Sequence, residues 1–233
     1  MANYGFIQKT IPATNQVSTL PFDNREHAGR LLADRLSSYK GKHPLVLAIP
    51  RGAVPMAKII AEALGGDLDV ILVRKLAHPL QPELAIGAID EGGEAILLNH
   101  ALDIEPQYLE TEKKQQLQML RRRRATYTPS RAPIDCRERI VIVVDDGIAT
   151  GSTMTAALRA ARAREPGRLL AAVAVAAPQA IQSIAQEADA VACLHVPAEF
   201  YAVDQFFKDF SQVSDRDVIK ILQQRESSPP AIR

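Results

Sequence analysis

The sequence is poor in cysteine, in net charge and in long apolar runs, and each shortage excludes a class of protein. Cys136 and Cys193 are the two cysteines of 233 residues, too few for a disulfide framework or a cysteine metal cluster. Lys and Arg number 28 against 27 Asp and Glu, a net charge of +1, which argues against a general binder of nucleic acid or membrane surfaces. No apolar run approaches the ~20 residues of a membrane span. The N-terminus does not resemble a secretory signal, so a cytoplasmic protein is expected.

The composition is that of an ordinary globular protein, with 47% hydrophobic and 24% charged residues. A chain of this length is expected to form one main domain. Residues 1–21 are polar and weakly patterned and are predicted to be an N-terminal extension. Residues 22–225 are predicted to form the domain, and residues 226–233, which contain Ser-Ser-Pro-Pro, a flexible tail.

Apolar runs and helical periods alternate along the domain. Strands are predicted at 45–49, 70–73, 140–144, 170–176 and 190–194. Helices are predicted from Asp23 or Asn24 to Gly41 and at 54–64, 104–127, 152–163, 179–186 and 215–224, with a hairpin at 84–98. This alternation predicts an α/β fold, an open and mostly parallel twisted sheet flanked by helices. Ligands of such sheets bind beyond the carboxyl ends of the strands.

The most informative segment joins an apolar strand to a helix. The strand is followed by Asp145 and Asp146 and then by the loop Ile148, Ala149, Thr150, Gly151, Ser152 and Thr153. Main-chain amides at a helix N-terminus, with hydroxyl donors around them, suit a terminal phosphate. Two carboxylates beside that phosphate suit the hydroxyls of a sugar, or Mg²⁺ through water. The alternative is that the hydroxyls cap the helix and the aspartates are solvated.

This segment resembles the thirteen-residue signature of the type I phosphoribosyltransferases, with Gly147 as a departure where an apolar residue is usual. Further elements of the same family are Pro50-Arg51-Gly52, Arg74-Lys75-Leu76 and the run from Pro82 to Ala88. The resemblance covers residues 22–218 and points to a bacterial branch of the family. It implies the type I phosphoribosyltransferase fold, with a flexible flap at about 76–100 and a small C-terminal hood at about 195–213.

The resemblance also implies a reaction and a set of roles. The reaction is Mg²⁺-dependent transfer of the 5-phosphoribosyl group from 5-phosphoribosyl 1-diphosphate to a nitrogenous base, a purine being favoured, with release of pyrophosphate. Asp145 and Asp146 would hold the ribose hydroxyls, and Mg²⁺ through water, and residues 148–153 the 5′-phosphate. The pyrophosphate side is assigned to Arg51, Gly52, Arg74 and Lys75, with Lys75 also expected to act in catalysis.

The base-binding side is less defined by the sequence. Ala149 stands where 6-oxopurine enzymes of the family carry an acid, so a flap acid, Glu83 or Glu91, would assist the nucleophile unless both are solvated. The hood gathers aromatic residues in a chain with 5% aromatics. Its candidates for holding the base are Phe200, Tyr201 and Asp204, and the alternative is a cluster that packs the C-terminal helix onto the sheet.

Some features of the sequence also bear on functions other than phosphoribosyl transfer. The same pocket would serve a regulatory protein that senses the diphosphorylated sugar or a nucleotide without catalysis. The run Arg121, Arg122, Arg123 and Arg124 ends a long charged helix, where cations are favoured, and this argues against nucleic-acid binding. These arginines would be solvated, face the diphosphate or meet a partner, and a homodimer is expected. Adjacent aspartates do not match an aspartyl phosphotransfer loop.

Overall fold

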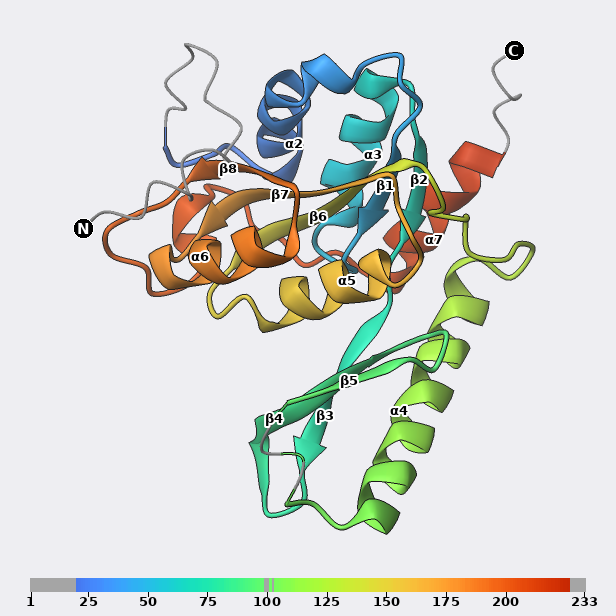
Figure 1. Ribbon diagram of the computed structural model, residues 1–233. Coiled ribbons are helices and arrows are strands. Elements are labelled where there is room, and N and C mark those ends of the chain that lie inside the picture. Colours follow the sequence, from blue (N-terminus) through green and yellow to red (C-terminus); the bar gives the residue numbers. More distant parts are fainter. Residues whose placement is uncertain (1–19, 99–100, 102, 227–233) are drawn as a thin grey trace.

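A computed structural model describes residues 20–98, 101 and 103–226 (Figure 1). Its centre is a five-stranded parallel sheet in the order β2-β1-β6-β7-β8. The strands are β1 (Leu45–Ala48), β2 (Asp67–Val70), β6 (Ile140–Ile148), β7 (Arg168–Ala176) and β8 (Ala190–His195). Eight of the nine residues of β7 are buried, because helices cover the sheet on both faces.

Helices lie in two layers around this sheet (Figure 1). On one face are α2 (Arg25–Arg35) and α3 (Val54–Leu64), and on the other are α5 (Ser152–Arg162) and α6 (Pro178–Glu187). Alternate residues of each strand supply the two cores: Val144 packs with α2 and α3, and Val143 packs with α5. The remaining elements of the core are η1 (Ser37–Tyr39), η3 (Asp204–Phe206) and α7 (Asp215–Glu226).

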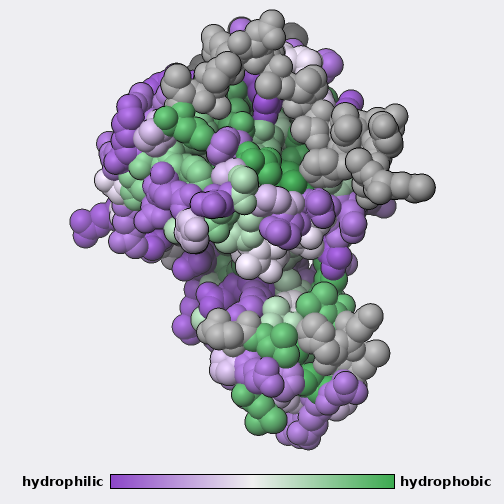
Figure 2. Space-filling model, turned by 90° about the vertical axis from the view of Figure 1, so that its left-hand side faces the viewer, coloured by the Kyte–Doolittle hydropathy of each residue, from purple (hydrophilic) through white to green (hydrophobic). Residues whose placement is uncertain are grey.

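A second, three-stranded antiparallel sheet extends from this core together with a long helix (Figures 1 and 2). It consists of β3 (Val73–His78), β4 (Gln81–Asp90) and β5 (Ala95–Leu97), and α4 (Pro106–Tyr127) packs along it. We call these four elements the arm. Leu76, Ile86 and Leu120 are buried between its sheet and its helix. The arm therefore has an apolar interior, which is continuous with the core on one face of the parallel sheet, and is more than a surface loop.

The predicted fold class is confirmed, and most element boundaries agree within a few residues. Two strand ends were wrong: the strand predicted at 140–144 continues as β6 to Ile148, and the strand predicted at 70–73 is misplaced. The predicted strand at 70–73 does not hold, because β2 ends at Val70, and Val73, Arg74 and Lys75 belong to β3 of the arm. Ile71 and Leu72 join the two sheets and are fully buried, so the apolar run continues across the break. None of the described helices has the length and apolar character needed to cross a membrane.

Candidate functional site

The acidic pair lies within β6 instead of following it. The strand continues to Ile148 because β7 keeps pairing with it, Asp145 opposite Val173 and Gly147 opposite Val175. The neighbour on the other side, β1, stops pairing after Val144. The aspartates thus lie at the carboxyl edge of the sheet, where one neighbouring strand has ended.

The two carboxyl groups differ in their surroundings. Although part of Asp145 stays exposed, burial of its carboxyl and the charge of Asp146 raise the pKa of Asp145 well above its usual range. The Asp146 carboxylate is paired with Arg25, whose Nε lies 2.7 Å from Oδ2. The pair therefore favours one neutral and one ionised carboxyl group.

Arg25 is a site residue that the sequence interpretation missed. Besides Asp146, its guanidinium contacts the main-chain oxygen of Ser211, at 2.8 Å from Nη1, and the ring of Phe210, 3.6 Å from Cζ to the ring centre. A signal was present in the sequence. A cation at the first position of a helix opposes the helix dipole, and such a residue needs a partner from elsewhere.

The loop after β1 meets the acidic pair through Gly52. A Cβ atom at residue 52 would lie 2.1 Å from Oδ2 of Asp146, so the carboxylate occupies the space that any side chain would need. In the same loop, the peptide bond between Pro50 and Arg51 is cis. Two predicted segments that are nearly a hundred residues apart, Arg51-Gly52 and Asp145-Asp146, are brought together here.

The predicted phosphate loop is exposed at the start of α5. Ile148 ends β6 and is buried, Ala149 and Thr150 are exposed, and Gly151 precedes the helix with φ of +81°. Because Gly151 has no side chain, it cannot cap the first-turn amides as Ser or Asp would. The hydroxyls of Thr150 and Ser152 lie 3.1 Å apart, and Thr153, in the first turn of α5, is exposed.

The hood lies next to the acidic pair. A Cβ atom at Gly147 would lie 2.3 Å from Cγ1 of Val203, so the glycine lets the hood pack directly on β6. Phe206 and Phe207 are buried, and the ring of Phe200 lies 5.7 Å from that of Phe206. The hood candidates thus divide into one ring in the cluster, Phe200, and two exposed residues, Tyr201 and Asp204.

The main chain at the start of α2 holds the hood in place. Phe22 donates from its N–H to the oxygen of Phe206 and accepts from the N–H of Lys208, both at 2.8 Å. Its ring packs against that of Phe207 at 5.3 Å. The aromatic cluster therefore packs the hood onto Phe22 and the sheet. Phe206 and Phe207 also share a core cluster with Val218 and Leu222 of α7, in agreement with the alternative that the aromatics pack the C-terminal helix.

The remaining predicted residues lie on the arm. Arg74 Nε donates to Oε1 of Gln116 on α4 at 2.5 Å, and Lys75 is exposed on β3. Glu91 was a candidate for the flap acid, and this prediction is wrong. Both of its carboxylate oxygens accept from Arg124 at 2.5 Å, and the residue is 9% exposed. It is an ion-pair partner and is not available to a base.

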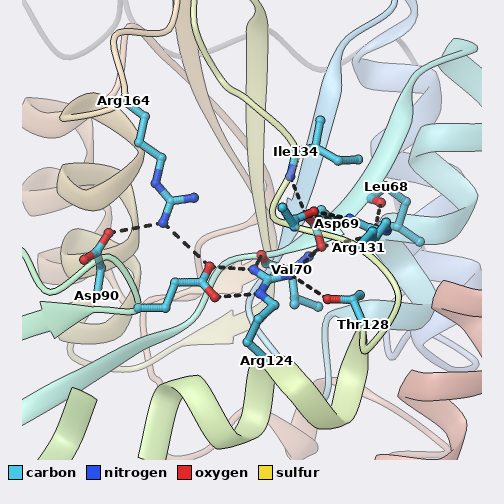
Figure 3. Close-up of polar contacts among 11 residues, drawn as sticks. Leu68, Asp69, Val70, Asp90, Arg124, Thr128, Arg131, Ile134 and Arg164 are labelled. Carbon is cyan, nitrogen blue, oxygen red and sulfur yellow. Dashed lines mark hydrogen bonds and ion pairs between the residues drawn. The ribbon is translucent and has the colours of Figure 1, made fainter. Parts of the chain in front are cut away.

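Arg124 forms the centre of a buried polar network at the foot of the arm (Figure 3). Its Nη1 donates to Asp69 and its Nη2 to the main-chain oxygen of Val70, both at 2.7 Å. Burial opposes the charge, but the bonds to Glu91 and Asp69 outweigh it and raise the pKa of Arg124. Asp69 also accepts from Arg131. The network joins β2 of the core to the arm.

The arginine run is thus divided in role. Arg124 is buried, whereas Arg121, Arg122 and Arg123 are exposed on α4. Arg164, just beyond α5, extends the network to the arm by donating to Asp90 at 3.1 Å. Among residues 20–98, 101 and 103–226, no three His, Cys, Asp or Glu side chains gather as a metal site.

Comparisons with known proteins agree with this arrangement. The family model "Phosphoribosyl transferase domain" matches residues 23–207. Two curated relatives from Mycobacterium tuberculosis, "Putative phosphoribosyl transferase Rv0571c" from strain H37Rv and "Putative phosphoribosyl transferase MT0597" from strain CDC 1551, are each 41% identical over 204 residues, or 86% of this chain. The chain matches 46% of the length of these relatives.

A solved structure is also similar. The crystal structure of TT1426 from Thermus thermophilus is 44% identical, with a TM-score of 0.80, and the match covers 87% of this chain and 98% of that one. The five-stranded parallel sheet with helices on both faces defines an open α/β fold, and the acidic pair lies at its carboxyl edge. Together with the family match, they show that the chain belongs to the phosphoribosyltransferase family, of type I.

Proposed function

We propose that the site at the carboxyl ends of β1 and β6 binds 5-phosphoribosyl 1-diphosphate and that the chain transfers its 5-phosphoribosyl group to a nitrogenous base. The observation that carries the proposal is the contact of Asp146 with Gly52. It joins an acidic pair suited to a diol to a loop whose Arg51 suits a diphosphate, and the exposed first turn of α5 follows the same strand.

Each part of the ligand then meets a different segment. Main-chain amides of residues 149–153 and the hydroxyls of Thr150, Ser152 and Thr153 hold the 5′-phosphate. Asp145 and Asp146 hold the ribose hydroxyls as positive charge develops at C1. A lone pair of the base nitrogen forms the new bond to C1, and the bond from C1 to the diphosphate oxygen breaks, so pyrophosphate leaves with its electron pair. The proton of the attacking nitrogen passes to the proposed flap acid or to water. The positive charge of Arg51 stabilises the negative charge that develops on the leaving pyrophosphate.

The residues at this site fit Mg²⁺. This ion keeps several waters and binds through one or two carboxylates and phosphate oxygens of the ligand, so the absence of a three-ligand cluster among the described residues agrees with such a site. Asp145 and Asp146 would hold it through water. When bound, the ion neutralises charge on the diphosphate.

The acceptor would bind beside the acidic pair and against the hood. The hood lies next to this part of β6, because Val203 packs on Gly147. Phe200, Tyr201 and Asp204 are the proposed contacts of the base, for which a purine is favoured. Glu83, on β4, remains the proposed flap acid. Arg74 and Lys75, near the start of β3, are the proposed contacts of the diphosphate on the arm.

A second candidate is a regulatory protein that binds the same sugar without turnover. The observation that favours it is the ion pair of Glu91 with Arg124, which occupies one of the two candidate flap acids. The loop before α5 supplies no acid either, because it has Ala149 at that position. A binding protein needs the sugar site but needs no acid to assist a nucleophile. The enzyme and the regulatory protein would therefore use the same site and differ in whether the bound sugar reacts.

The test measures pyrophosphate release from 5-phosphoribosyl 1-diphosphate with Mg²⁺ across a panel of purine and pyrimidine bases. We expect release with at least one base, and at least about tenfold weaker binding of the sugar in the Asp146→Asn variant. Tight binding without turnover on any base would establish the regulatory candidate instead. Absence of binding to the wild-type protein would contradict both.

A further inference from the structure

The carboxylate that the proposed function assigns to ribose is held by an arginine from another element. Arg25 begins α2, and its Nε lies 2.7 Å from Oδ2 of Asp146. The two side chains are 11% and 13% exposed, so the pair is largely shielded from water. A charged hydrogen bond in such surroundings is stronger than an exposed ion pair.

The guanidinium of Arg25 is fixed by more than this bond. Its Nη1 donates to the main-chain oxygen of Ser211 at 2.8 Å, and its plane lies over the ring of Phe210. The two hydrogen bonds come from two different nitrogens of the guanidinium, and the contact with Phe210 uses the planar shape of the group. A lysine ammonium has the same charge but cannot reproduce this combination.

The hood segment that holds Arg25 is itself tied to the start of α2. Asp209 donates from its N–H to the oxygen of Asp23 at 3.0 Å, and Lys208 Nζ lies 2.6 Å from Oδ1 of Asp23. Arg25 therefore lies between two fixed parts of the molecule, the acidic pair on one side and the hood on the other.

We propose that Arg25 is the positioning residue of the sugar site: it fixes the orientation of Asp146 and links that carboxylate to the hood. The inference rests on the proposed function. The bond to Oδ2 sets the orientation in which the other oxygen meets a ribose hydroxyl. Arg25 acts through Asp146 on the sugar and has no role toward the phosphate, which binds at the start of α5.

The test compares two probes, ribose 5-phosphate and inorganic phosphate, by calorimetry with Mg²⁺ present. For Arg25→Gln we expect about tenfold weaker binding of ribose 5-phosphate and less than about twofold change for inorganic phosphate. Arg25→Lys is expected to show the same selective loss, because charge alone does not orient Asp146. Arg30→Gln, which removes an exposed ion pair to Glu26 on the same helix, is the matched control and should bind both probes as the wild type does.

A double-mutant cycle separates positioning from general damage. If Arg25 acts through Asp146, the double variant Arg25→Gln/Asp146→Asn binds ribose 5-phosphate no more weakly than Asp146→Asn alone. Equal losses for both probes, or losses that add, would overturn the proposal. If Arg25→Gln does not fold, the lysine variant decides, and wild-type affinity in that variant would also overturn it.

The same experiment distinguishes this inference from the function on which it rests. A wild-type protein that binds ribose 5-phosphate no better than inorganic phosphate contradicts the proposed function. Selective sugar binding that Asp146→Asn weakens, but that both Arg25 variants leave unchanged, contradicts only the positioning role.

Discussion

Gly52 is the residue at which the main chain and a functional side chain approach most closely. A methyl group there would lie 2.1 Å from Oδ2 of Asp146 and 3.4 Å from Nε of Arg25. Because Asp146 is short and already bonded to Arg25, it cannot move aside and keep that bond. We expect Gly52→Ala to weaken ribose 5-phosphate binding by about tenfold, close to the effect of Asp146→Asn, as titration calorimetry would measure. An affinity equal to that of the wild type would show that Asp146 moves freely.

The sequence predicted the residues of this contact better than the contact itself. The acidic pair, Arg51 and Gly52 stand in recognisable motifs, and the structure brings the two motifs together. Arg25 was missed because it reaches Asp146 across 121 positions and lies in no motif. Glu91 was misassigned for a related reason, since its partner, Arg124, lies 33 positions away in a run that suggested a solvated surface.

At the scale of the element, α4 offers a comparison within four consecutive arginines. Arg124→Met leaves Glu91 and Asp69 buried without their central cation, and we expect it to lower the free energy of unfolding by about 3–5 kcal/mol. Arg122→Met, on the exposed face, should change it by less than about 0.5 kcal/mol. Denaturant unfolding of both variants provides the measurement. Similar stabilities would mean that the network contributes little.

The C-terminal end of α4 also makes a contact that responds to pH. The hydroxyl of Tyr127 lies 2.6 Å from Oδ1 of Asp215 on α7, and burial, followed by this bond, raises the pKa of Tyr127 to about 12. A raised pKa means that the neutral form is favoured in the folded state. The contribution of Tyr127 to stability is therefore complete below about pH 10, the ordinary pKa of tyrosine, and is lost as pH rises toward 12.

The matched variant is Tyr127→Phe, which keeps the ring and removes the hydroxyl. The stability difference between wild type and variant should narrow between pH 10 and pH 12, as measured by denaturant unfolding at a series of pH values. The titration of lysines affects both proteins and cancels in the comparison. A difference that stays constant across this range would contradict the assigned pKa.

Elements with a clear period were predicted well from the sequence, and breaks inside apolar runs were not. The helix at 54–64 has the bounds of α3, because Pro55 and Gly65 mark its two ends. The break between β2 and β3 was missed, because Ile71 and Leu72 remain buried while the chain passes between sheets. Hydrophobicity reports burial, and here burial continues where strand pairing stops.

At the scale of the whole molecule, the arm could not be derived from its parts. A hairpin at 84–98 and a long helix at 104–127 were predicted separately, and the structure packs them together as one lobe with an apolar interior (Figure 2). The foot of this lobe is held to the core by Arg124 and Arg164, whereas Leu80, in the turn between β3 and β4, is 85% exposed.

The pairing of Phe22 with Phe207 affects where the domain can be cut. The family match starts one residue later, at Asp23, and a shortened protein designed on that boundary would lack the amide and carbonyl that anchor Phe206 and Lys208. It would also lose a ring with no exposed surface. A truncation at the boundary of the family match would therefore detach the hood from the start of α2. Loss of activity in such a fragment would not show that the intact chain is inactive.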